Sequence, residues 1–231
     1  MSLHQDPGVF PIPNPWDIGS ARLLEALGFR ALATTSSGFA QSLGRLDGRV
    51  TLEEKLRHCE ELAQATTVPI TADLENCFGD DPESAASCIR RFSETGVVGG
   101  SIEDFTGDRQ KPIYDFNLAV ERVAAAAEAA RSCPFNFTLT ARAEQQLRGR
   151  DDIEETVKRL QAYEAAGADV LYAPALKTLD EVRLVSASIG KPLNVLGTPF
   201  AGCSVEELGD AGAKRVSIGG ALARLVAGVV I

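Results

Sequence analysis

Short apolar segments alternate with longer amphipathic segments along the whole chain, and this order predicts β-strands separated by α-helices. The short segments are rich in β-branched and other apolar residues, and eight of them are expected to be strands. They are Val9–Pro13, Ala31–Thr35, Pro69–Asp73, Gly100–Ile102, Asn136–Thr140, Val170–Ala173, Leu193–Leu196 and Arg215–Ile218.

Residues that start and end helices stand between these segments. Thr51 with Glu54 matches a capping box, Asp81 before Pro82 is typical of a helix N-cap, and Asp151 and Asp152 place acids on an opening turn. Glycine precedes every second strand, where a helix end is expected to turn left-handed, and proline precedes the strands between them. These junction residues are Gly28, Gly96, Gly167, Gly212, Pro69, Pro134 and Pro192.

Eight strand–helix units in 231 residues fit a (β/α)8 TIM-type barrel better than an open doubly wound sheet, which usually has fewer parallel strands. No long Pro/Ser-rich linker divides the chain. We therefore expect one α/β barrel domain spanning residues 1–231.

Composition and charge limit the classes of function. The formal net charge of −9 disfavours binding to nucleic acid or to an anionic membrane surface. Neither a membrane-spanning apolar segment nor a signal peptide is recognisable, so a cytoplasmic protein is expected. The 5 cysteines are scattered without a CxxC pair, which argues against a disulfide framework and a thiolate zinc site.

Polar residues gather where the strands of such a barrel end, which is where barrel enzymes carry their active sites. Asp73 and Glu75 follow the third strand, Glu103 ends the fourth, and Arg142 follows the fifth. Carboxylates beside a guanidinium suggest a hard divalent cation and a fork for a substrate carboxylate. Alternatively, the acids are helix caps and Arg142 is their structural counter-ion.

Two further features have alternative interpretations. Ser36, Ser37 and Gly38 after the second strand are either part of a binding loop or a plain turn. Gly219 and Gly220 before the last helix resemble a phosphate loop, but two glycines are a weak signal and close packing is the favoured interpretation.

Five motifs occur in an order and spacing that resemble the isocitrate lyase and phosphoenolpyruvate mutase superfamily, from Pro13 to Gly220. They are Ser37-Gly38-Phe39 with Gly44 and Asp47, Ala72-Asp73-x-Glu75-Asn-x-x-Gly79, Ser101-Ile102-Glu103-Asp104, Ala141-Arg142-x-Glu144 and Ala165-Ala-Gly167-Ala-Asp169. The resemblance implies a (β/α)8 barrel. It also implies Mg²⁺-dependent cleavage or formation of a C–C or P–C bond next to a 2-oxo acid, through an enolate.

The resemblance also implies roles for individual residues. Asp73 matches the direct ligand of Mg²⁺ (or Mn²⁺), and Glu75 and Glu103 would hold the same ion directly or through water. Arg142 matches the arginine that clamps the substrate carboxylate and the 2-oxo oxygen. Substrate-binding roles fall on Ser37, Gly38, Phe39 and, more weakly, Asn194, whereas Asp47 matches an aspartate beside the metal on a mobile loop.

Departures from the family pattern bear on which subfamily the chain resembles. The Lys-[Lys/Arg]-Cys-Gly-His motif of the lyases is absent, and Cys77 and Cys88 are expected to be packing residues. The loop from Phe105 to Pro112 also misses the mutase and hydrolase pattern, although Lys111 is a partial substitute. His58 is expected to be solvated on a charged helix, so a histidine base is not expected.

The expected activity is therefore that of a lyase, decarboxylase or hydrolase acting on a small 2-oxo or 2-hydroxy dicarboxylate. The alternatives are a P–C bond enzyme of the phosphonopyruvate hydrolase or mutase type, and a catalytically weak 2-oxo acid binding protein. After the eighth strand, the apolar run from Gly220 to Ile231 carries one charge, Arg224. We expect this helix to be buried in a homo-oligomer (dimer or tetramer), and a C-terminal helical extension found in the family to be missing.

Overall fold

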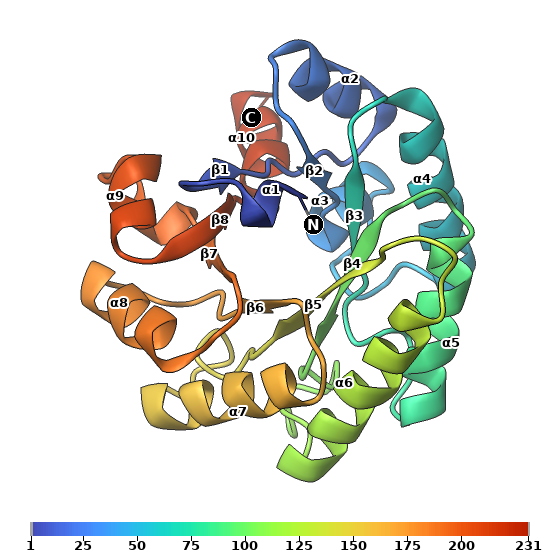
Figure 1. Ribbon diagram of the computed structural model, residues 1–231. Helices are drawn as coiled ribbons and strands as arrows, with labels where there is room; N and C mark the ends of the chain where they lie inside the picture. Colours follow the sequence, from blue (N-terminus) through green and yellow to red (C-terminus); the bar gives the residue numbers. More distant parts are fainter. Residues whose placement is uncertain (1, 231) are drawn as a thin grey trace.

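A computed structural model describes residues 2–230, and its eight strands form one all-parallel sheet (Figure 1). All eight expected strands are present in the expected order, and no strand end is shifted by more than two residues. Their bounds are β1 Phe10–Pro11, β2 Leu32–Ala33, β3 Ile70–Asp73, β4 Gly99–Glu103, β5 Thr138–Arg142, β6 Val170–Tyr172, β7 Leu193–Leu196 and β8 Ala213–Ser217.

The sheet curls into the predicted barrel. The strand order is β1-β8-β7-β6-β5-β4-β3-β2, so only β1 and β2 lack a ladder between them. Hydrogen bonds close this seam just beyond β1, because Ala33 N donates to Pro13 O across 3.0 Å and Asn14 Nδ2 donates to Thr34 O across 3.2 Å. The fold is thus a (β/α)8 TIM-type barrel.

The helices surround the sheet, as Figure 1 shows. They are α1 Ser2–Gln5, α2 Ile18–Ala26, α3 Ser36–Ser42, α4 Leu52–Ala65, α5 Pro82–Ser93, α6 Phe116–Arg131, α7 Ile153–Ala165, α8 Leu179–Ser188, α9 Val205–Asp210 and α10 Ala221–Val230, with a 3-10 turn η1 Thr198–Phe200. None of the helices within residues 2–230 combines the length and apolar character needed to span a bilayer.

Local sequence signals place the helix ends. Thr51 and Glu54 form the predicted capping box of α4, and Asp81 and Asp152 cap α5 and α7 through their side chains. The four junction glycines all have positive φ, from 89° at Gly28 to 107° at Gly167, which an L side chain rarely adopts.

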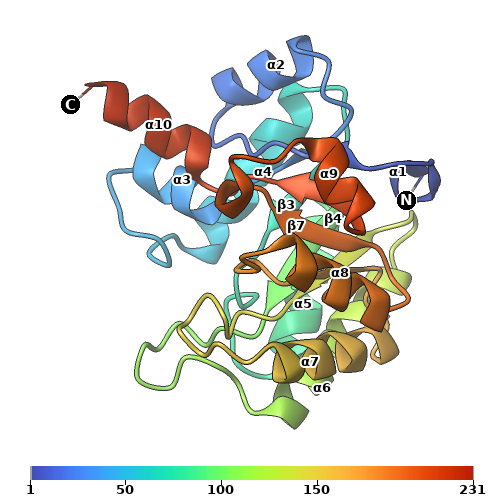
Figure 2. The same ribbon diagram turned by 90° about the vertical axis from the view of Figure 1, so that its left-hand side faces the viewer.

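The two ends of the barrel differ. At the amino-terminal end, Leu3 of α1 packs against Phe10, Ile12 and Ala31, so this short helix covers the end of the barrel. Figure 2 shows α1 at one end and the loops that follow β2, β4 and β5 reaching out at the opposite end. The carboxyl ends of the strands are therefore the open end, where a binding site is expected.

Candidate functional site

A cavity of about 1030 Å³ opens at the carboxyl ends of the strands. Most of the residues singled out from the sequence line it, namely Ser37, Asp47, Asp73, Glu75, Glu103, Arg142 and Asn194. Gly38 and Phe39 do not line it. Seven of the nine predicted site residues thus come together from five different strand ends.

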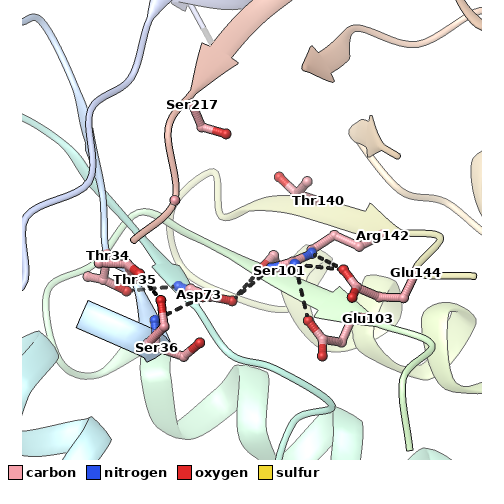
Figure 3. Close-up of polar contacts among 12 residues, drawn as sticks. Thr34, Thr35, Ser36, Asp73, Ser101, Glu103, Thr140, Arg142, Glu144 and Ser217 are labelled. Atoms are coloured by element: carbon pink, nitrogen blue, oxygen red, sulfur yellow. Dashed lines mark hydrogen bonds and ion pairs between the residues drawn. The ribbon is translucent and has the colours of Figure 1, made fainter. Parts of the chain in front are cut away.

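Arg142, the last residue of β5, lies at the centre of the polar side chains in this cavity (Figure 3). Its Nη1 is 3.0 Å from Asp73 Oδ1, and its Nη2 is 3.4 Å from Glu103 Oε2 and 2.6 Å from Glu144 Oε1. The guanidinium also lies over the Tyr172 ring, 4.9 Å from the centroid. Three carboxylates and an aromatic face fix the fork in one orientation.

Asp73 remains ionised despite its burial. Burial disfavours its charged form, but the cations of Arg142 and Lys55 outweigh this effect and hold the pKa of Asp73 below its usual value. Its Oδ2 accepts the amide of Ser36 across 3.0 Å, and its own amide donates to Thr34 Oγ1 across 2.9 Å. These bonds attach the end of β3 to the segment after β2.

Glu75 lies on a strained part of the loop after β3. Glu75, Cys77 and Phe78 have φ values of 52°, 60° and 58°, a conformation that costs a non-glycine residue of the order of 1–3 kcal/mol. Buried Arg122 of α6 holds this loop by donating to the carbonyl groups of Asn76 and Gly79. Burial and the charge of Asp73 raise the pKa of Glu75 to about 7.

Glu103 and Glu144 form a buried acidic pair between two arginines. Burial and the charge of Glu144 raise the pKa of Glu103 well above its usual value. Arg148 donates from Nη2 to Glu144 Oε2 across 2.9 Å and lies 3.9 Å from Glu103. Four carboxyl groups therefore surround two guanidinium groups at this end of the cavity, since Asp73 and Glu75 also lie near Arg142.

The segment Ser37-Gly38-Phe39 is the first turn of α3. The amides of Gly38 and Phe39 are occupied within this turn, donating to Thr35 Oγ1 and to Thr35 O. A Cβ at Gly38 would lie 2.6 Å from the side chain of Thr35 and 3.0 Å from that of Trp16, so close packing explains this glycine. Of the three residues, only Ser37 faces the cavity.

Asp47 and Asn194 line the cavity from the loop after α3 and from β7. Asp47 is on the exposed loop after α3, near Ser36 and Asp73, and the neighbouring Gly48 approaches Glu75. Asn194 of β7 is buried, and its amide accepts from Arg215 Nε across 2.7 Å and donates to Ser217 Oγ across 3.0 Å. Its position suits a residue that orients Arg215.

The expectation that His58 is solvated is wrong. It is 4% exposed on the inner face of α4, stacks on Phe39 with ring centroids 3.7 Å apart, and donates from Nε2 to Trp16 O. Burial and the nearby Lys55 lower the pKa of His58 to about 3. The imidazole of His58 is therefore neutral and packed in the folded protein.

Sequence reasoning also missed two buried cations. Lys55 of α4 is 0% exposed and donates from Nζ to Thr34 Oγ1 across 3.2 Å, behind Asp73. Arg215 of β8 is 5% exposed and lines the cavity. Spacing held a signal for both, because Lys55 shares a helix face with Cys59 and Leu62, and Arg215 alternates with Ser217 on the inner side of β8.

The donor set fits a hard divalent cation. The acidic side chains offer only oxygen atoms, and burial together with a neighbouring carboxylate raises the pKa values of Glu75 and Glu103, an effect that a bound cation would oppose. Within residues 2–230, no three His, Cys, Asp or Glu side chains are arranged to enclose an ion. An ion at Asp73 would therefore keep water in most of its coordination positions, which is the usual preference of Mg²⁺.

The remaining motifs of the sequence serve packing. Cys77 and Cys88 are each 2% exposed in the core, as expected. A Cβ at Gly220 would lie 2.3 Å from Ser37 Oγ, so close contact between α3 and the start of α10 requires this glycine.

Comparisons with known proteins identify the family and the fold. The family model described as phosphoenolpyruvate phosphomutase matches residues 1–230. A crystal structure of a candidate lyase/mutase from Burkholderia cenocepacia J2315 is 52% identical, with a TM-score of 0.95, covering 98% of this chain and 82% of that one. The 2-methylisocitrate lyase of Shewanella oneidensis MR-1 is 30% identical over 85% of this chain and 69% of its own length. A phosphonopyruvate hydrolase crystallised with oxalate and Mg²⁺ is 23% identical, with a TM-score of 0.87 over 96% of this chain and 79% of its own, and shares the fold.

Proposed function

Because the chain belongs to the isocitrate lyase and phosphoenolpyruvate mutase superfamily, we propose that it is a Mg²⁺-dependent carbon–carbon lyase, decarboxylase or hydrolase. Its substrate is a small 2-oxo or 2-hydroxy dicarboxylate, and the reaction passes through a pyruvate-enolate-like species. The superfamily comprises lyases, mutases and hydrolases, and the choice of C–C chemistry is the specific part of the proposal.

The observation that carries the proposal is the position of the Arg142 fork among carboxylates inside the cavity. Its Nη1 is 3.0 Å from Asp73 Oδ1, so a cationic group for a substrate carboxylate adjoins an anionic group for a cation. A 2-oxo acid needs both, because its carboxylate and 2-oxo oxygens lie in one plane.

Asp73 would anchor the cation, with Glu75, Glu103 and Asp47 around its water ligands. When bound, Mg²⁺ would stabilise the negative charge that develops on the 2-oxo oxygen as the enolate forms. The donor set supports this assignment, as does the phosphonopyruvate hydrolase of the same fold that was crystallised with oxalate and Mg²⁺.

The chain's own residues orient the substrate and hold its charge. Arg142 would donate to the substrate carboxylate from the N–H groups that its three acidic partners leave free. The Ser37 hydroxyl faces the same cavity from the start of α3 and would bind the other carboxylate oxygen. Glu144, with 0% exposure, keeps the guanidinium in place through bonds to Nε and Nη2.

A substrate screen tests the proposal. Oxaloacetate and 2- or 3-substituted 2-oxo and 2-hydroxy diacids are incubated with the protein, with Mg²⁺ or with EDTA, and the release of pyruvate or another 2-oxo acid is followed. We expect Mg²⁺-dependent release from at least one diacid. Turnover of phosphonopyruvate alone would establish the P–C alternative, and tight oxalate binding without turnover of any compound would establish a binding protein.

A further inference from the structure

Arg215 is a buried cation without an anionic partner. Arg215 is 5% exposed, and no carboxylate within residues 2–230 lies within 4.0 Å of its guanidinium. Its neighbours are neutral, since Nε donates to Asn194 Oδ1 across 2.7 Å and Nη2 donates to Thr140 Oγ1 across 3.0 Å. Burial accordingly lowers the pKa of Arg215 to about 10.

Arg142 shows the opposite arrangement in the same cavity. Its charge is balanced by Asp73, Glu103 and Glu144, all within 3.4 Å. A buried charge that lacks a counter-ion is costly to the fold, and proteins usually pair such a charge. The charge of Arg215 is therefore neutralised by no carboxylate of the described residues, whereas Arg142 shares its charge among three carboxylates in addition to the substrate carboxylate assigned to it.

The guanidinium of Arg215 reaches the cavity from its floor. Arg215, Thr140, Asn194 and Ser217 all line the cavity. Thr140 precedes Arg142 by two residues on β5, so both side chains point into the barrel. Along the strand, Thr140 lies about 7 Å further from the open end than Arg142 does. Figure 3 shows Thr140 and Ser217 on the β5 and β8 sides of the Arg142–Asp73 pair.

We propose that Arg215 binds the distal carboxylate of a dicarboxylic substrate, with Asn194 and Thr140 orienting its fork. This inference rests on the proposed function in that Arg142 and Asp73 would hold the 2-oxo acid end of the same molecule. A diacid with a chain of four or five carbons, and a hydrogen bond of about 2.8 Å at each end, spans the distance between Arg142 and the Arg215–Thr140 pair. Arg215 would then be the residue that selects diacids over monoacids.

Equilibrium binding with matched ligand pairs tests this role. Oxaloacetate is compared with 2-oxobutyrate, and 2-oxoglutarate with 2-oxopentanoate, each as a competitor of oxalate in the presence of Mg²⁺. We expect the parent to prefer at least one diacid by about 30-fold or more, the usual scale for a buried charge-assisted contact. In Arg215→Gln this preference should fall to less than about 3-fold, with oxalate affinity unchanged.

Arg224 supplies the matched control, because it also lines the cavity but is exposed. Arg224→Gln should retain the preference for the diacid. Loss of the preference in Arg224→Gln and not in Arg215→Gln would overturn the assignment. If Arg215→Gln does not fold, equal affinities of the parent for the members of both pairs would overturn it, and so would an unchanged preference in Arg215→Lys, which lacks the fork.

A measurement without metal separates this inference from the proposed function. Succinate and butyrate have no 2-oxo group, and in EDTA neither depends on a cation. Succinate should raise the melting temperature of the parent and leave that of Arg215→Gln unchanged, whereas butyrate should affect neither. Failure of oxalate to bind with Mg²⁺ would count against the proposed function alone, and equal effects of succinate on both proteins would count against Arg215.

Discussion

Arg142 Nη1 and Asp73 Oδ1 lie 3.0 Å apart, although 69 residues separate the two in sequence. The ion pair joins the end of β5 to the end of β3, across β4. Both side chains are largely buried, at 14% and 17% exposure. The pair therefore fixes the distance between the two groups to which we assign the substrate carboxylate and the cation.

Replacing Arg142 with lysine should distinguish the contribution of the positive charge to binding from that of the planar guanidinium group. Lysine keeps the positive charge but loses the planar fork that reaches Asp73, Glu103 and Glu144. We expect oxalate affinity in the presence of Mg²⁺ to fall by about 2–5 kcal/mol, roughly 30-fold or more. Arg183→Lys, at an exposed site on α8, is the control. Equal oxalate inhibition of the parent and Arg142→Lys would contradict the role of the fork.

Asp104 should stabilise the folded protein and also position Glu144. Its Oδ1 accepts the amide of Glu144 across 2.7 Å, and its Oδ2 accepts Tyr163 Oη across 2.7 Å and Arg159 Nη1 across 3.2 Å. Asp104→Asn would leave the buried Arg159 without this partner, so the free energy of unfolding should fall by about 3–5 kcal/mol. Urea denaturation at pH 7 measures it, with exposed Asp180→Asn as the control. A loss below about 1 kcal/mol would disprove the prediction.

Buried His58 should make the folded state sensitive to acid. Its pKa is about 3 in the folded protein and about 6.5 when unfolded, so below pH 6.5 only the unfolded state takes up the proton. The contribution of His58 to stability is thus intact above pH 6.5 and decreases as the pH falls toward 3. His4, whose pKa burial also lowers to about 3, acts in the same direction.

The His58→Gln variant isolates this contribution. The difference in unfolding free energy between the parent and His58→Gln should change in favour of the variant by about 1.4 kcal/mol for each pH unit below 6.5. Urea denaturation from pH 7 to pH 5 measures it. A difference that stays constant over this range would show that His58 is protonated in the folded protein.

Local signals in the sequence were sufficient to predict the barrel. The eight apolar segments, the capping box at Thr51 and the glycines at helix ends all lie where the structure has them, because each depends on a few neighbouring residues. Acidic residues at the ends of β3 and β4 could also be expected to share a site with Arg142, because neighbouring parallel strands end at the same edge of the sheet.

Burial of charged residues was missed because the sequence signal for it is weaker. Lys55 lies one helical turn before Cys59, but Lys55 and His58 belong to a helix with many charges, and the packing of α4 against the barrel shows that both face inward. Arg215 looked like a polar residue at a strand start, whereas its distance to Thr140 depends on the curvature of the sheet. Amides of Gly38 and Phe39 are occupied by the cap at Thr35, which the motif alone did not reveal.

The protein should be a homo-oligomer. On α10, Leu225 and Val226 are 65% and 55% exposed, so the helix presents an apolar face that another subunit would cover. Light scattering at low micromolar concentration should give a mass of at least twice the 24.5 kDa of one chain. A Leu225→Glu, Val226→Lys variant should shift the mass toward one chain. A mass of 24.5 kDa for the parent would contradict the prediction.

Calorimetric titration of Mg²⁺ in the presence of oxalate is the sharpest test of the proposed metal site, on which the enolate chemistry depends. Because we assign Asp73 as the anchor of the cation, the parent should bind Mg²⁺ and Asp73→Asn should show no measurable binding. Asp180→Asn, which removes an exposed carboxylate 91% accessible to solvent, should bind Mg²⁺ like the parent. An unchanged Mg²⁺ affinity in a folded Asp73→Asn variant would contradict the assignment of Asp73 and, with it, the proposed function.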